Sequence, residues 1–169
     1  MVGPLRAVRF CAFAAGLFLL PLSSALAQDR LAELRARFSQ QNDPVRKAKV
    51  LSKLGQAEIE LLRKEVSAGQ YAEALRLLEE HREEVKATYA ALKQSGINPE
   101  KKPGGFKDLQ IHLRKTSRQL RDAILILPYS QREPFHTIRG ELEEMESELI
   151  DMLFPRQPGK SPEERKRKG

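Results

Sequence analysis

The stretch "SAGQYAEALRLLEEH", residues 67–81, indicates a sharp turn between two helices. Gly69 interrupts a long pattern of helical period, because glycine is the usual residue just past a helix end. From Tyr71 onward, apolar side chains recur at helical spacing, as at Ala74 and Leu78. A helical pattern of similar length precedes the turn. The stretch therefore predicts a helical hairpin, and the fold class follows from extending this pattern along the chain.

Helical periodicity covers the chain from about residue 29 to about residue 154, and no alternating run of β-branched residues predicts a strand. We expect an all-α fold, an antiparallel helical bundle of four long helices plus a short N-terminal helix. The long helices are predicted at about 44–68, 70–94, 106–127 and 131–154, and the short one at about 29–41. Asp43 is suited to the N-cap and Pro44 to the first position of the helix predicted at 44–68. Gly96 is expected to end the helix predicted at 70–94.

The last two predicted helices have narrow apolar seams, of the kind that pack at shallow angles in coiled-coil-like bundles. The short connection at 128–132 makes them antiparallel neighbours. We expect this connection to cover Leu125, and Ser130 with Glu133 to form a capping box. Bases on the third long helix are expected to pair with glutamates on the fourth: Lys107, Arg114, Lys115, Arg118 and Arg121 with Glu141, Glu143, Glu144, Glu146 and Glu148.

The helix predicted at 44–68 differs from the others, because its polar residues occupy only about 100° of the helical wheel. A helix with so wide an apolar arc is covered on two sides. We expect it to be the best-buried element of the bundle, or to give one side to a second copy of the chain.

The turn at 67–81 resembles the one that opens the second helix of tetratricopeptide repeats. The register does not support a repeat array. With Ala74 placed on the alanine of the repeat pattern, Glu58 falls on the tryptophan position and Lys86 on the proline position. The residues 34 positions away on either side, Gln40 and Asp108, show no second copy.

Residues 1–27 have the features of a cleavable signal peptide. Two arginines precede an apolar segment at 10–22, which is too short to span a bilayer as a helix, and "ALA" at 25–27 supplies the small residues of a cleavage site. We expect cleavage after Ala27 and a periplasmic or secreted protein. The only cysteine, Cys11, lies inside this segment, so the mature chain would hold no disulfide and no thiolate ligand.

The formal charge of +7 comes mainly from the chain ends. Two bases lie in the leader and six in 155–169, which leaves 22 bases and 21 acids in 28–154. The tail, "PRQPGKSPEERKRKG", lacks large apolar residues and is predicted to be a disordered basic segment. Its last bases, Arg165, Lys166, Arg167 and Lys168, are candidates for contact with an anionic lipid or cell-wall polymer. Nucleic acid is disfavoured, since no aromatic side chain stands among these bases.

The sequence offers no catalytic motif. There is no Gly-x-Ser-x-Gly turn, no Ser-x-x-Lys and no phosphate loop. His81 lies on an apolar seam and is interpreted as a hydrogen-bonded core residue rather than a metal ligand, because the only other histidines are His112 and His136. We therefore expect no catalytic residue, no metal and no cofactor, and the chain is predicted not to be an enzyme.

These observations predict one helical-bundle domain, residues 28–154, between a leader and a basic tail. The function favoured by the sequence is a non-enzymatic protein of the bacterial envelope that binds another protein, in a chaperone-like, inhibitory or scaffold role. The alternative is a structural spacer or tether that the basic tail holds to an anionic envelope surface. The identity of the partner cannot be derived from the sequence, and self-association is compatible with it.

Overall fold

The computed structural model of the chain describes residues 22–155, with side-chain burial described from residue 29. Most of the predicted leader and the basic tail lie outside this range. All regular elements within it are helical: α1 (Leu22–Gln40), α2 (Pro44–Ser67), α3 (Tyr71–Gln94), α4 (Gly104–Ile126), the 3₁₀ turn η1 (Tyr129–Gln131) and α5 (Arg132–Leu153). The predicted all-α bundle of four long helices and a shorter N-terminal one is confirmed.

The turns that separate the first three helices follow their local chemistry. Asp43 caps α2, because its carboxylate accepts the backbone N–H of Arg46 at 2.8 Å. Gly69 has a φ of 76°, in the left-handed region. The backbone N–H of Gln70 bonds to the carbonyl of Glu65 at 2.9 Å, and that of Gly69 to Val66 at 3.1 Å. These two bonds form a Schellman motif, which only glycine enters without a steric cost.

Two helix starts differ from the sequence prediction. α1 begins at Leu22, just after Pro21, rather than near residue 29. The sequence prediction starts this helix after the expected cleavage site at Ala27, whereas helical backbone also covers residues 22–28. The capping box of Ser130 and Glu133 is absent: η1 takes up Ser130, so α5 starts at Arg132 without a side-chain cap.

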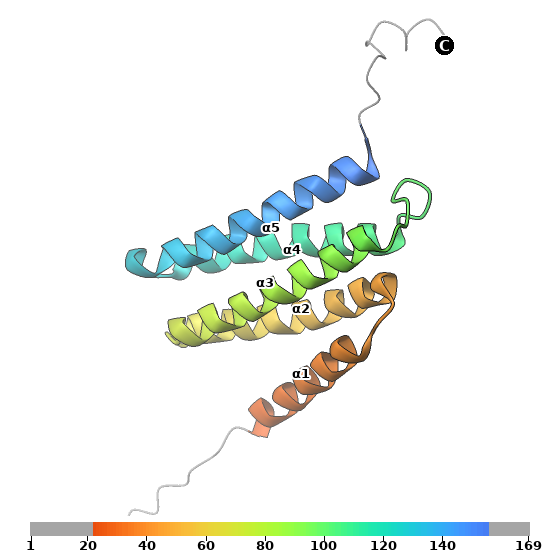
Figure 1. Ribbon diagram of the computed structural model, residues 1–169. Coiled ribbons are helices and arrows are strands. Elements are labelled where there is room, and N and C mark those ends of the chain that lie inside the picture. Colours follow the sequence, from red (N-terminus) through yellow and green to blue (C-terminus); the bar gives the residue numbers. More distant parts are fainter. Residues whose placement is uncertain (1–21, 156–169) are drawn as a thin grey trace, which may run out of the picture.

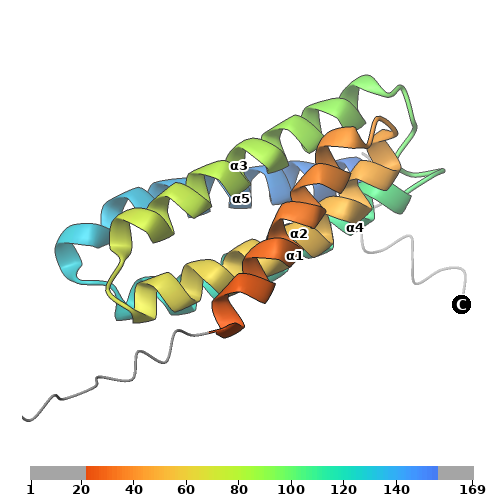
Figure 2. The ribbon, with the colours of Figure 1, turned by 90° about the horizontal axis from the view of Figure 1, so that it is seen from below.

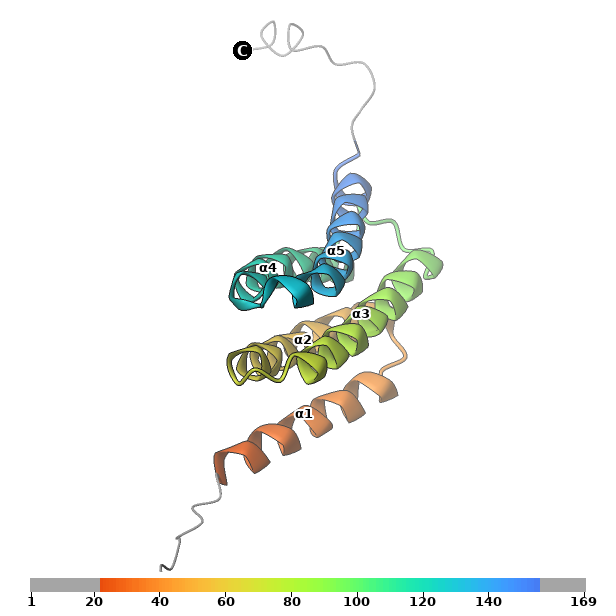
Figure 3. The same cartoon turned by 90° about the vertical axis from the view of Figure 1, so that its left-hand side faces the viewer.

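The helices form three layers, with the α2–α3 hairpin between α1 and the α4–α5 hairpin (Figure 3). Successive long helices alternate in direction, so α2 and α4 run the same way (Figure 1 and Figure 2). α2 packs against α1, α3 and α4, whereas α3 and α4 barely touch. The four long helices are therefore ordered α2, α3, α5, α4 around the bundle, with α3 and α4 on one diagonal.

This arrangement explains the wide apolar arc of α2, because helices lie on three of its sides. Its side chains Leu51, Leu54 and Leu62 are at most 1% exposed, in the same core as Leu109 of α4 and Leu78 of α3. A second copy of the chain is not needed to cover α2. None of the helices within residues 22–155 combines the length and hydropathy needed to cross a membrane.

The predicted charge pairing between α4 and α5 is wrong. Within the described range, the α5 glutamates that form interhelical ion pairs reach α3 instead, with Glu141 2.7 Å from Lys86 and Glu148 3.5 Å from Lys93. On the α4 side, Glu146 accepts a hydrogen bond from the uncharged Gln110. α5 packs against both α3 and α4. Helix packing therefore decides which of the two helices the α5 glutamates reach, and the pattern of charges in the sequence does not predict it.

Candidate functional site

Three ionisable side chains lie inside the bundle core. Glu58 of α2 is 1% exposed, His81 of α3 is 0% exposed, and His112 of α4 is 6% exposed. Each occupies a position of helical spacing that would ordinarily hold an apolar residue, as Glu58 does between Leu51 and Leu62. Buried charged groups are costly unless they are paired, so their contacts determine what this cluster can do.

The three side chains form one continuous chain of polar contacts. His81 Nδ1 lies 3.0 Å from Glu58 Oε2 and donates a hydrogen bond to it. His81 Nε2 lies 3.2 Å from His112 Nε2, so one of these nitrogens donates and the other accepts. At the other end, the Arg35 guanidinium of α1 donates to Glu58 Oε1 through Nε at 3.2 Å and Nη2 at 3.0 Å. The same Nη2 also reaches Glu80 at 2.7 Å.

Gly55 of α2 makes room for both imidazole rings. A Cβ atom at this position would lie 2.4 Å from His81 Cε1 and 2.5 Å from His112 Cε1, well inside van der Waals contact. The rings meet edge to face, with centroids 5.1 Å apart and an interplanar angle of 76°. The absent side chain therefore allows the two histidines to meet in the core.

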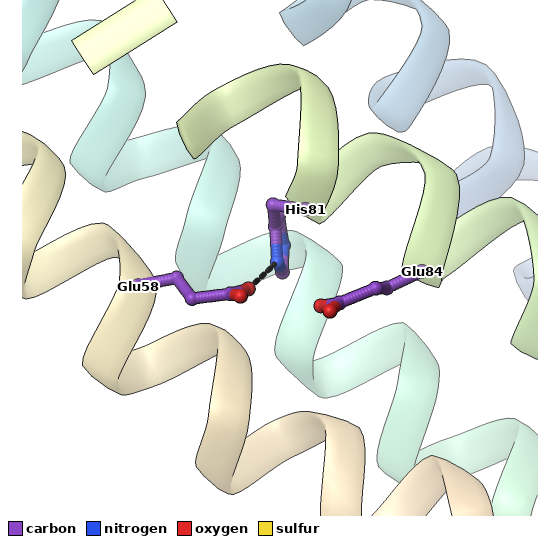
Figure 4. Close-up of side chains that lie close together, drawn as sticks. All are labelled: Glu58, His81 and Glu84. Atoms are coloured by element: carbon purple, nitrogen blue, oxygen red, sulfur yellow. Dashed lines mark hydrogen bonds and ion pairs between the residues drawn. The ribbon is translucent and has the colours of Figure 1, made fainter. Parts of the chain in front are cut away.

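Glu84 of α3 completes the cluster from the side opposite Glu58 (Figure 4). Its Oε2 atom is buried and has no hydrogen-bond partner among the described residues. Burial, followed by the charge of Glu58, raises the pKa of Glu84 to about 8. Burial also raises the pKa of Glu58, but the hydrogen bond and the attraction of His81, together with the hydrogen bonds of Arg35, outweigh it, so the pKa of Glu58 lies below its ordinary value.

His112 is held in its neutral form. Burial lowers its pKa to about 3, and the nearby His81 and Lys115 act in the same direction. The imidazole also borders a depression of about 240 Å³ that is shared with Ser52 and Gln56 of α2. The third histidine, His136, is exposed on α5 and does not join the cluster.

The opposite end of the polar chain opens onto a larger depression of about 530 Å³. It is lined by four glutamates and one base: Glu79, Glu80, Glu83, Glu84 and Arg35. Such a lining favours cations over anions, and it gives solvent a route to the edge of the buried cluster. Among residues 29–155, Glu58, His81 and Glu84 also form a group whose ligand atoms, one per residue, all lie within 4.8 Å of one another.

Sequence reasoning identified only part of this site. His81 is buried and hydrogen-bonded, as its seam position predicted. Glu58 was missed as a functional candidate, although it stands on the apolar line Leu51, Gly55, Glu58 and Leu62 of a predicted helix. A charged residue on an apolar line, one helical turn after a glycine, could have identified Glu58 as a buried polar residue that needs a partner. The predicted contact residues Arg165–Lys168 lie outside the described range.

A separate apolar surface lies at the corner between α4 and α5. Leu125, Ile126 and Tyr129 are 69%, 64% and 88% exposed, respectively. We call these three residues the apolar corner. The expectation that the connection covers Leu125 is therefore wrong: the buried residue at this turn is Leu127, at 1% exposure.

Comparison with known proteins finds no matching family model, no matching curated protein and no matching solved structure.

Proposed function

We propose that this chain is a non-enzymatic helical-bundle protein of the bacterial envelope that holds another protein through the apolar corner. The observation that carries the proposal is the exposure of Leu125, Ile126 and Tyr129, which stand within five consecutive positions of the chain. A chaperone-like, inhibitory or scaffold role is compatible with such a surface.

Exposed apolar side chains are common singly, but a group of three large ones is typical of an interaction site. Tyrosine is also enriched among the residues that dominate binding energy, because its ring buries a large area at a low entropic cost. Among residues 29–155, Tyr129 is the most exposed of the large apolar side chains, so it is the first candidate for an anchor that enters a pocket of the partner.

The corner has a backbone that is held in place before any partner arrives. The guanidinium of Arg132 donates to the carbonyl of Leu127 at 2.9 Å and to that of Leu125 at 3.2 Å. Pro128, between Leu127 and Tyr129, further restricts the backbone of this turn. A preorganised surface loses less conformational entropy on binding, which favours affinity.

Site-specific photocrosslinking in envelope extract tests this function. A photoreactive residue at position 129 is expected to give a discrete crosslink to another protein, whereas the same residue at exposed Ser147 of α5 should not. The double variant Leu125→Ser/Ile126→Ser should abolish the crosslink from position 129 without changing the thermal melt. Ile111→Ser, at a 51% exposed site on α4 outside the corner, is the matched control. Crosslinks that survive the double variant, or that join only two copies of this chain, would contradict the proposal.

The alternative of a spacer or tether stays a prediction, because the tail that would carry it lies outside the described residues. Deletion of 155–169 tests it: loss of envelope retention with unchanged crosslinking at position 129 would favour the tether.

A further inference from the structure

We propose that Glu58, His81 and Glu84 bind a first-row divalent transition-metal ion of the Zn²⁺ type, with water from the acidic depression completing its coordination. The two carboxylates approach His81 from opposite sides (Figure 4), and the ligand atoms of the three residues lie within 4.8 Å of one another. This site is separate from the apolar corner, so the inference is independent of the proposed function.

The donor chemistry matches this class of ion. Imidazole nitrogen and carboxylate oxygen together suit Zn²⁺ and its neighbours, whereas Mg²⁺ and Ca²⁺ prefer oxygen alone. Three protein ligands with an open position are typical of zinc sites that keep a bound water. Tetrahedral bonds of about 2.0–2.2 Å place donor atoms roughly 3.4 Å apart, so donor atoms that lie up to 4.8 Å apart would move closer by up to about 1.4 Å around an ion.

The contacts that Glu58 and His81 make with Arg35 and His112 do not use the proposed donor atoms. Arg35 bonds to Glu58 Oε1, so Oε2 is the oxygen directed toward His81. On the far side of the ring, His81 Nε2 faces His112 Nε2 at 3.2 Å. When His81 Nδ1 binds an ion, its proton resides on Nε2 and is donated to His112. Hydrogen bonding of the second ring nitrogen is the usual way in which proteins orient a metal-binding histidine.

Glu84 distinguishes this site from a purely structural hydrogen-bond network. A network accounts for Glu58, His81 and His112, because each has a partner in the core. It does not account for Glu84 Oε2, a buried carboxylate oxygen with no hydrogen-bond partner among the described residues. Buried oxygens of this kind are rare without an ion, a water or a special role. A bound cation would satisfy that oxygen, and the open depression beside it provides an entry path.

Calorimetric titration of the EDTA-treated protein with Zn²⁺ tests the site. We expect one equivalent to bind and Mg²⁺ not to compete. Glu84→Gln, which keeps the shape of the side chain but removes an anionic ligand, should weaken Zn²⁺ binding by tenfold or more with an unchanged circular dichroism spectrum. Glu83→Gln is the matched control, because it removes the same charge from the same depression at a 63% exposed side chain, and it should change the affinity less than about twofold.

Three results would overturn the proposal. The first is failure of the wild-type protein to bind one equivalent of Zn²⁺. The second is an equal loss of affinity in the two glutamine variants, which would show general attraction by the acidic depression. The third is loss of binding in His136→Ala with retention in His81→Gln, which would place the ion at the exposed histidine instead.

Discussion

The Nε2 atoms of His81 and His112 lie 3.2 Å apart inside the bundle, on helices α3 and α4 that otherwise barely touch. Their contact crosses the diagonal of the bundle beside Gly55 of α2. A pair of imidazoles thus links two helices whose backbones approach each other at only a few residues. Gly55 leaves room for the two rings, and Arg35 and Glu58 continue the polar chain from His81. Variants of Gly55 and Arg35, and changes of pH, therefore test this link.

Gly55→Ala should destabilise the protein, because the new Cβ would lie within 2.6 Å of atoms in both rings. Overpacking of a filled core costs about 1–3 kcal/mol, which we expect as a lower midpoint in urea denaturation. Gly140→Ala is the control, since its Cβ would meet nothing within 4 Å on α5. That variant should be neutral or more stable by up to about 1 kcal/mol, as helix propensity alone predicts. Equal effects of the two variants would argue against the role of Gly55.

Arg35→Ala should destabilise the protein by about 2 kcal/mol, because the buried carboxylate of Glu58 would lose the guanidinium that donates two hydrogen bonds to its Oε1 atom. The value is below that of a fully buried pair, since the Arg35 side chain is 35% exposed and His81 still bonds to Glu58. Arg37→Ala removes a base whose pair with Glu33 is exposed, and it should cost less than about 0.5 kcal/mol. Chemical denaturation of both variants measures the difference, and similar losses would contradict it.

The stability of the metal-free protein should fall as the pH rises from about 5 to 8. The pKa of Glu84 is raised to about 8 in the folded state, so the folded chain holds a proton that the unfolded chain has already released. The contribution is complete below the ordinary carboxylate pKa and is lost as the pH passes the raised value. Urea midpoints in EDTA should show this slope in the wild type, and Glu84→Gln should remove it. An unchanged slope in the variant would mean that another group titrates.

Acid should destabilise the protein through His112. Its pKa is lowered to about 3, so between pH 6.5 and 3 the unfolded chain binds a proton that the folded chain excludes. Stability should therefore decline as the pH falls through this window. NMR titration of the His112 ring should show no protonation above pH 4, while exposed His136 serves as the internal comparison. Protonation of both rings at the same pH would rule out this account.

The helices could be predicted from the sequence because their signals are local. Asp43 with Pro44 and Gly69 act within a few residues of the chain, and the observed boundaries follow them. The predictions that failed depended on distant contacts. The glutamates of α5 pair with α3 because of the order of helices around the bundle, and Leu125 is exposed because the turn buries Leu127 instead.

The candidate site could be predicted only in part, for the same reason. Periodicity placed His81 on a buried seam, and burial there requires a partner. It could not indicate that the partner is Glu58, 23 positions earlier, or that His112 of a diagonal helix completes the chain.

The sequence by itself determined the all-α class, the number of long helices and the two glycines that end helices, Gly69 and Gly96, both of which have positive φ. It could do so because propensity, capping and periodicity act over one or two helical turns. Tertiary structure alone decided that α3 and α4 occupy opposite corners, and that Glu58, His81, Glu84 and Arg35 meet at one end of a polar chain. The physical reason is that a helix fixes only which residues share its face. Which faces meet is decided by packing among residues far apart in the chain, and here the space left at Gly55 is part of that packing.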